Sequence, residues 1–221
     1  MAYDFHGGWD DVTGPHSALH SKDGLNTEHA LDLYLAAGVP SSKIVCGLPL
    51  YGRAWTLQKT GRIEYGVKAS GLAKPGVCTQ EAGVLNQMEI KNLIGKNFKV
   101  DKDTQTVIGW SGDQFVTFDN EETLGYKIDY FCQRGLGGVM TWAMSMDDDY
   151  KLMSFIHNKV ASCSTPTPPT PSSSSSSSGV CGDTVQCTKT MLECIKHTQP
   201  GQECACSETW SKCLSDEGCK P

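Results

Sequence analysis

Polar and aromatic side chains lie at the ends of three short apolar stretches of the sequence. Tyr3 and Asp4 lie in "MAYDF", Tyr51 and Arg53 follow "KIVCGLPL", and Trp142 comes near the end of "LGGVMTWA". If these stretches are parallel strands, their carboxyl ends meet at one edge of a sheet. Phenol, carboxylate and guanidinium groups can donate or accept hydrogen bonds, and an indole ring can stack on a flat ligand surface. The sequence therefore predicts a polar and aromatic site at that edge.

The elements that would position these side chains alternate between strand and helix. Short apolar stretches predict strands at 2–5, 43–52 and 136–143. Apolar residues at helical spacing predict helices at 27–37, 120–134 and 150–160. In the first helix Leu31, Tyr34 and Leu35 are expected to share a face. This alternation predicts an α/β fold with a parallel sheet.

One connection is much longer than a strand-to-helix loop needs. About 65 residues separate Arg53 from Asp119, where a handful would suffice. Within them we expect a helix at 83–92, a hairpin turning at 101–104 and a strand at 114–118. The stretch 54–118 is therefore predicted to be a small inserted α+β domain that walls a groove.

Three acidic residues, Asp147, Asp148 and Asp149, precede the last expected helix. They could bind a metal ion, but acidic residues at a helix N-terminus more often cap the helix and complement its dipole. We expect a cap, and we predict neither a metal site nor a cofactor.

Composition limits the possible partners. The chain has 221 residues and a net charge of −6, which gives no electrostatic case for nucleic acid or an anionic membrane. No apolar run is long enough to span a bilayer. Seven of the eleven cysteines lie in the last 41 residues, which indicates disulfides and an extracellular protein. A zinc-binding tail is the alternative, but paired C-x-x-C spacing is lacking.

The cysteine-rich tail follows a linker rich in Ser, Thr and Pro. We divide the chain into a domain at 1–163, a linker at 164–180 and a module at 181–221. In the module, two pairs of cysteines are seven residues apart, which is close to two helical turns. A helical hairpin with nested disulfides would join them, and the candidate bridges are Cys187–Cys213, Cys194–Cys206 and Cys181–Cys219.

Three motifs in order resemble family 18 glycoside hydrolases, the chitinases and their relatives. "MAYDFHGGWD", "GLPLYGRAW" and "GLGGVMTWAMSMDD" resemble the sixth, seventh and eighth strands of that family's TIM barrel, and the insertion falls where the family's insertion domain falls. The resemblance covers residues 1 to about 160 and implies the last three βα units of a TIM barrel.

The resemblance also implies a reaction and residue roles. The family cleaves β-1,4 links in N-acetylglucosamine polymers with retention, and the substrate's own acetamido oxygen is the nucleophile. Tyr3 would donate to the acetamido carbonyl, and Trp142 would form the floor of the subsite. The other implied sugar-contacting or cleft-lining residues are Met1, Asp4, Trp9, Tyr51, Arg53 and Glu81. Structural roles are the alternative: Trp142 in the core, Arg53 paired with a carboxylate, Asp4 capping a loop.

The family's D-x-x-D-x-D-x-E run, whose Glu is the general acid, does not occur in this sequence. We therefore interpret the chain as the C-terminal part of a longer secreted chitinase whose signal peptide lies upstream, and we expect it to be inactive alone. One alternative is a non-catalytic, lectin-like binder of chitin. Another is that the tail holds the protein on a polysaccharide surface.

Overall fold

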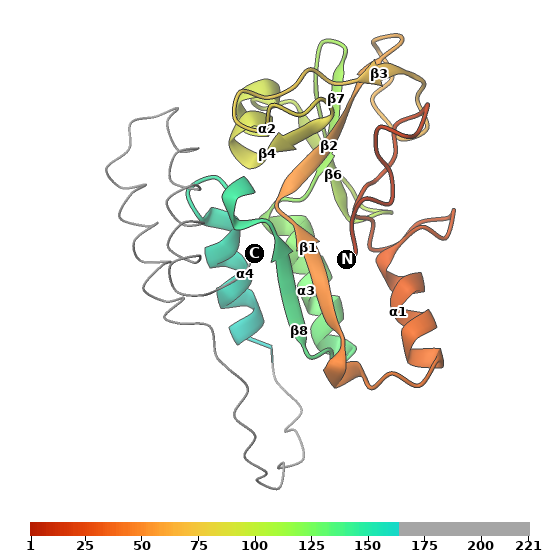
Figure 1. The fold of residues 1–221 in the computed structure, drawn as a ribbon, viewed down its shortest axis with the longest axis vertical. Helices are drawn as coiled ribbons and strands as arrows, with labels where there is room; N and C mark the ends of the chain where they lie inside the picture. The colour runs from red at the N-terminus through yellow and green to blue at the C-terminus, as the bar shows by residue number, and fades with distance from the viewer. Residues whose placement is uncertain (164–221) are drawn as a thin grey trace, which may run out of the picture. The chain divides into compact units, whose positions relative to one another are not determined.

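The computed structural model describes residues 1–163, and the elements it contains form two sheets (Figure 1). A parallel pair joins β1 (Val45–Pro49) to β8 (Gly138–Trp142), with Cys46 opposite Val139 and Leu48 opposite Thr141. This pair confirms the predicted parallel strands within 43–52 and 136–143, and β1 is buried beyond Val45. The expectation that the second strand is also buried is wrong: β8 is half-buried to exposed, because among the described residues no strand pairs with its other edge. Among the described residues the parallel sheet goes no further, so no closed barrel is present.

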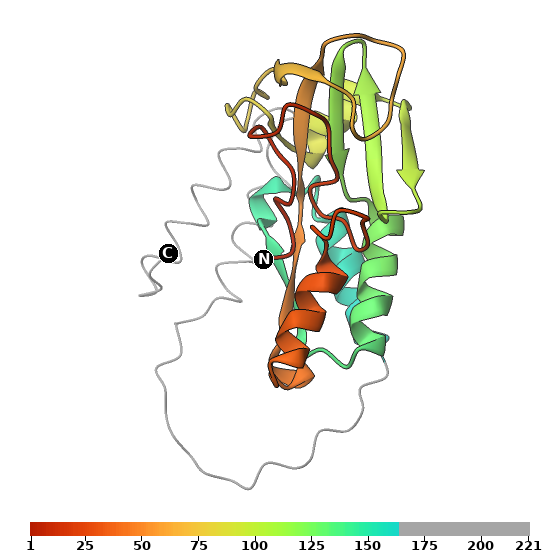
Figure 2. The ribbon, with the colours of Figure 1, turned by 90° about the vertical axis from the view of Figure 1, so that its right-hand side faces the viewer.

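Helices cover one face of the parallel pair. They are α1 (Thr27–Ala36), α3 (Glu121–Gln133) and α4 (Lys151–Ala161). Figure 2 shows α3 and α4 on the same side of β1 and β8. The shared core is aliphatic, and its most deeply buried members are Leu48, Leu50, Leu124 and Ile128. All three expected helices are confirmed to within one or two residues at each end, because apolar spacing is a local signal, as are the Asn caps of α1 and α3.

The second sheet is antiparallel and begins immediately after β1. Its strands are β2 (Tyr51–Leu57), β3 (Ala69–Leu72), β4 (Val84–Asn86), β5 (Phe98–Asp101), β6 (Thr106–Ser111) and β7 (Gln114–Phe118). The order is β3-β2-β7-β6-β5, with β4 also paired to β2. On one face Ala54 and Val116 pack near α2 (Gln87–Ile94), and on the other Trp55 packs with Phe115. The expected hairpin and the strand at 114–118 are confirmed.

Three sequence-based expectations are wrong. Residues 2–5 form no strand, because Asp4 adopts a left-handed conformation with φ +61°, which breaks an extended backbone. The helix expected at 83–92 starts later, since Asn86 and Glu89 form a capping box that places its first residue at Gln87. Tyr34 is 61% exposed instead of sharing the buried face with Leu31.

The acidic run before α4 acts as the expected cap. Asp147 accepts hydrogen bonds from the backbone amides of Leu152 and Met153 at 3.2 and 2.8 Å. Asp148 instead pairs with Lys91 of α2 and with Lys151. Within residues 1–163 no group of three acidic, His or Cys side chains is arranged to hold a metal ion.

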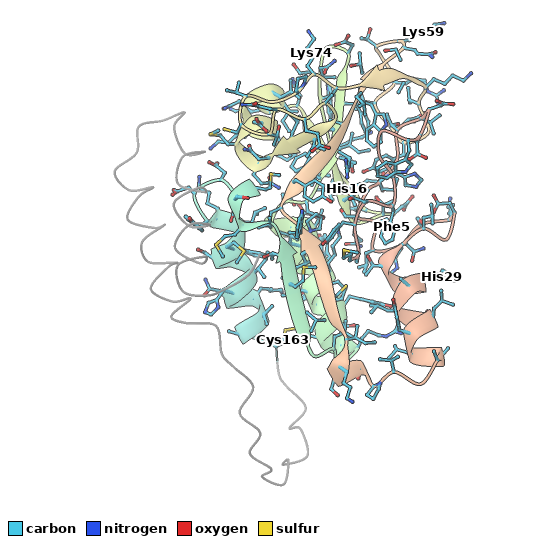
Figure 3. All side chains as sticks on the ribbon, viewed as in Figure 1. Phe5, His16, His29, Lys59, Lys74 and Cys163 are labelled. Atoms are coloured by element: carbon cyan, nitrogen blue, oxygen red, sulfur yellow. A yellow bond between two sulfur atoms is a disulfide. The ribbon has the colours of Figure 1, made fainter. Side chains whose placement is uncertain are left out.

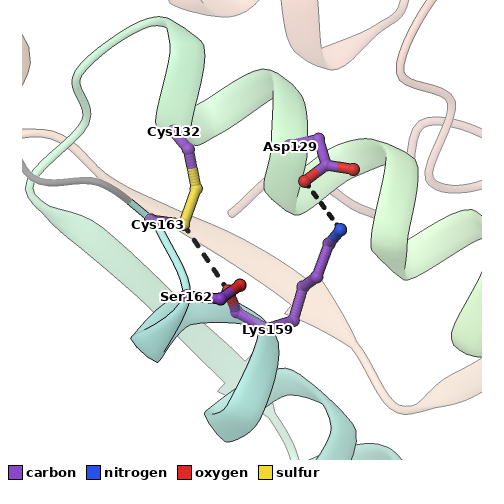
Figure 4. The surroundings of a disulfide bond; sticks show 5 residues. All are labelled: Asp129, Cys132, Lys159, Ser162 and Cys163. Atoms are coloured by element: carbon purple, nitrogen blue, oxygen red, sulfur yellow. Dashed lines mark hydrogen bonds and ion pairs between the residues drawn. A yellow bond between two sulfur atoms is a disulfide. The ribbon is translucent and has the colours of Figure 1, made fainter.

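A disulfide that the sequence analysis did not assign joins Cys132 at the end of α3 to Cys163 beyond α4 (Figure 4). Beside it, Lys159 of α4 pairs with Asp129 of α3 at 2.8 Å. The two links fasten the last helix to its neighbour. The bridges predicted for the cysteine-rich module lie outside the described residues. No helix among residues 1–163 has the length and hydropathy needed to cross a bilayer.

Candidate functional site

The Asp4 carboxylate is the centre of a polar cluster. Its Oδ1 accepts a hydrogen bond of 2.6 Å from the Tyr51 hydroxyl and one of 2.8 Å from Arg53 Nε. Partial burial raises the pKa of Asp4, but contacts with His16, Arg53 and Tyr51 outweigh burial and hold that pKa well below its usual range. Asp4 is therefore a carboxylate at any pH near neutrality. No described residue bonds its Oδ2, which is left to accept from a ligand.

The fold brings these three residues together from two segments. Tyr51 and Arg53 are two residues apart on β2, so both side chains leave the same face of the strand. Pairing of β2 with β4 and β7 fixes that strand on both sides. The left-handed turn at Asp4 directs its carboxylate to the two donors. The structural alternative for Arg53, pairing with a carboxylate, is what the structure shows, and the carboxylate is Asp4 itself. A sugar contact by Arg53 stays a prediction.

Tyr3 lies beside this cluster and is almost fully buried. Its ring meets the Tyr51 ring edge-on, with 6.1 Å between centroids. Gly47 of β1 makes room for it, because a Cβ there would lie 2.8 Å from the Tyr3 ring. The Tyr3 hydroxyl is buried and has no hydrogen-bond partner among the described residues. Burial and the Asp4 charge raise the pKa of Tyr3, so its hydroxyl stays protonated and able to donate.

The remaining predicted residues are at the surface around the cluster. Trp9 is 60% exposed, and the Arg53 guanidinium lies 5.1 Å from its ring centroid. Trp142 ends β8 opposite Pro49 and is 57% exposed, so the alternative of a core position for it is wrong. Met1 and Glu81 are also exposed, and the Glu81 charge contributes to raising the pKa of Arg53.

Sequence reasoning missed His16. Its side chain is completely buried, its ring lies 5.2 Å from the Tyr51 ring, and its Nδ1 lies 3.9 Å from Asp4 Oδ1. Figure 3 places it where the N-terminal segment passes the start of β2. The surrounding sequence, "TGPHSALH", has no helical or strand periodicity, so only its mix of small and apolar residues indicated burial.

A second buried cluster lies nearby and was also missed. Lys127 Nζ contacts both carboxylate oxygens of Asp119 at 2.5 and 2.6 Å. Ser17 and Thr123 hydroxyls donate to the same carboxylate at 2.8 and 2.7 Å. Because this carboxylate is saturated and sealed from solvent, it ties the 15–19 segment to α3 and offers nothing to a ligand.

Comparison with known proteins assigns the family. The family model described as glycosyl hydrolases family 18 matches residues 1–147, so this chain belongs to that family. Mouse chitotriosidase-1 is 35% identical over 155 residues, which is 67% of this chain and 33% of that protein.

Two solved structures share the fold. A mutant of the family 18 chitinase of Cycas revoluta, in complex with (GlcNAc)4, is 31% identical with a TM-score of 0.67, over 72% of this chain and 45% of that one. Human YKL-39, a pseudo-chitinase with retained chitooligosaccharide binding properties, is 27% identical with a TM-score of 0.68. The match covers 73% of this chain and 50% of that one. The chain thus spans half or less of the length of these relatives.

Proposed function

We propose that this chain forms part of a cleft that binds chitooligosaccharides, and that it corresponds to the last three βα units of the family's TIM barrel. The observation that carries the proposal is the cluster in which Tyr51 and Arg53 donate to Asp4 beside Tyr3, inside the segment that matches the family. Support also comes from the Cycas chitinase, solved with (GlcNAc)4, and from YKL-39, which binds chitooligosaccharides.

The proposed roles are those that the family resemblance implies, and the geometry of the cluster is compatible with them. Tyr3 donates its unpartnered hydroxyl to the acetamido carbonyl of the sugar, and being neutral it stabilises the charge that develops there. Asp4 accepts from a sugar hydroxyl through Oδ2 while Tyr51 and Arg53 hold Oδ1. Trp142, which is exposed, forms the floor of the subsite where the bond breaks, since a flat indole buries much apolar area against a pyranose. Met1 and Trp9 line the cleft, and Glu81 reaches a neighbouring sugar.

For the reaction, we propose retaining, substrate-assisted hydrolysis in a longer protein that supplies the D-x-x-D-x-D-x-E general acid. This chain alone is expected to give no turnover of chitin oligomers above a blank, because general acid catalysis is worth roughly 10²–10⁴-fold. The second candidate function is non-catalytic binding of chitin. YKL-39, a pseudo-chitinase that retains chitooligosaccharide binding, is an example of this kind of protein in a similar structure. Turnover by the chain alone would contradict this division of roles.

We propose an extracellular location, to which the Cys132–Cys163 disulfide is suited. We also keep the division into an insertion at 54–118, a linker at 164–180 and a cysteine-rich module at 181–221. Limited proteolysis tests that division: the first cuts are expected within 164–180, because a segment so rich in Ser and Pro has little apolar surface to bury.

Calorimetric titration of the full chain with (GlcNAc)4 tests the binding proposal. Saturable binding is expected for (GlcNAc)4 and not for cellotetraose, which lacks the acetamido group that Tyr3 contacts. Asp11→Asn is the matched control for Asp4→Asn, since Asp11 is exposed on the same N-terminal segment. Equal affinity for the two sugars, or no binding of either, would refute the proposal.

A further inference from the structure

His16 is a buried polar side chain without a hydrogen-bond partner. Neither ring nitrogen is bonded by any described residue, although the side chain is completely buried. Leaving a buried polar group unpaired costs about 1–3 kcal/mol, and native structures contain few such groups. A phenylalanine would fill a similar volume without that cost. The imidazole at this position therefore requires a reason other than packing.

A charged acceptor close to the ring belongs to the proposed sugar site. His16 Nδ1 lies 3.9 Å from Asp4 Oδ1, somewhat too far for a hydrogen bond. The same Oδ1 already accepts from Tyr51 and Arg53. Hydrogen bonds in ligand-free sites are often long and tighten only when the ligand binds. A shift of about 1 Å by the Asp4 carboxylate would complete this one.

The segment that carries His16 is held by contacts on both sides of the residue. The His16 carbonyl accepts from the Phe5 amide at 2.9 Å, next in sequence to Asp4. Ser17 is bonded to Asp119, which Lys127 also holds. The ring packs against Tyr51, with 5.2 Å between centroids. His16 is therefore a rigid partner against which the Asp4 carboxylate can settle.

We propose that His16 is a positioning residue: its Nδ1–H donates to Asp4 when a chitooligosaccharide occupies the site, and so holds the carboxylate in the orientation that accepts from the sugar. The inference rests on the proposed function of the Asp4 cluster. It assigns His16 no contact with the sugar.

The charge on His16 agrees with a neutral donor. Burial lowers the pKa of His16 and outweighs the opposing influence of Asp4 and Asp119, while the Lys127 charge lowers that pKa further. Tyr51, whose ring packs on the imidazole, is neutral because burial and Asp4 raise its pKa. A neutral imidazole donates from one nitrogen only, and the geometry requires that this nitrogen be Nδ1.

His16→Phe separates the positioning role from packing. The phenyl ring keeps the contact with Tyr51 and removes both nitrogens, so a packing role predicts unchanged affinity and an unchanged or higher Tm. A positioning role predicts about tenfold weaker binding of (GlcNAc)4, because losing a hydrogen bond to a charged group lowers the affinity by about that factor or more. The Tm should not fall in this variant. His16→Gln, which restores a donor, should recover most of the affinity. His29→Phe on the exposed face of α1 is the matched control (Figure 3).

A second readout is made at saturating (GlcNAc)4. The exchange rate of the Arg53 Nε–H with solvent reports how steadily Asp4 is held, and in the bound state it should be about threefold or more higher in His16→Phe than in the wild type or in His29→Phe. His16→Met replaces His16→Phe if the latter does not fold. Wild-type binding with unchanged affinity in the apolar variant would overturn the proposal. If the wild type binds no (GlcNAc)4, the proposed function fails and the positioning role fails with it. If the wild type binds but the bound-state Arg53 exchange rate is unchanged in the apolar variant, the positioning role alone is overturned.

Discussion

Two aspartates in this molecule each accept hydrogen bonds from a cation and from a hydroxyl, but in opposite surroundings. The side chains of Asp119 and Lys127 are 0% and 2% exposed, and Asp119 is bonded through both oxygens. The side chains of Asp4 and Arg53 are 34% and 18% exposed, and only Oδ1 of Asp4 is bonded. The closed cluster fixes the fold, whereas the open one keeps an acceptor for a ligand.

Two neighbouring residues of the chain link the two clusters. Ser17 belongs to the closed cluster, and the residue before it, His16, faces the open one. The sealed ion pair therefore sets the position of the segment on which the site depends. A buried pair of this kind contributes little net stability over an apolar pair, yet losing one partner is costly because it leaves a charge unpaired. The comparison predicts a large effect on stability at Asp119 and a large effect on binding at Asp4.

The largest stability effect is expected from Lys127→Met. It leaves the Asp119 carboxylate buried without its cation, which costs about 3–5 kcal/mol. Thermal or urea denaturation measures the loss. Lys99→Met, at an exposed position of β5, is the control and should stay within about 0.5 kcal/mol of the wild type. A small loss for Lys127→Met would mean that the closed cluster is not essential to the fold.

Asp4→Asn should have a small effect on stability and a large effect on binding, the opposite of what is expected for the Asp119 cluster. The side chain is partly exposed, so its removal as an ion-pair partner should cost only about 1 kcal/mol of stability. Affinity for (GlcNAc)4 should fall about tenfold or more, because a charged acceptor for the sugar hydroxyl is lost. Denaturation and calorimetric titration of the same preparation give both numbers. Wild-type affinity in this variant would remove Asp4 from the site.

The sequence could predict those parts of this contrast that depend on neighbouring residues, and not those that depend on contacts between residues far apart in the chain. The helices and the antiparallel hairpin were predictable because caps, turns and apolar spacing are local. Asp4, Tyr51 and Arg53 were found through family motifs that lie in separate stretches. The closed cluster was not found, since a lysine in a helix is typically solvated and the Ser17–Asp119 contact spans 102 residues. The turn at Asp4 was missed for the same reason: its hydrogen-bond donors on β2 are more than 40 residues away.

Tyr3→Phe should have a small effect on stability and a selective effect on function. The hydroxyl has no partner among the described residues, so removing it should leave the free energy of unfolding within about 1 kcal/mol or raise it. In a longer protein that carries the general acid, turnover should fall far more than affinity, because the hydroxyl matters most as charge develops. Steady-state kinetics with a fluorogenic chitooligosaccharide would measure this, and an unchanged turnover number would exclude Tyr3 from the mechanism.

The smallest expected effect is a dependence of stability on pH in the acid range. The pKa of Asp4 is lower in the folded protein than in the unfolded chain, where it is about 3.9. Its stabilising contribution is therefore complete above about pH 5, and it declines as the pH falls below the unfolded value towards the folded one. The Tm difference between the wild type and Asp4→Asn should be constant from about pH 5 to 7 and should shrink below about pH 4. Repeating the comparison in an Arg53→Met background should weaken that dependence, because Arg53 contributes to lowering the Asp4 pKa. A difference that grows on acidification would show that the Asp4 cluster opposes folding, contrary to the hydrogen bonds that hold it.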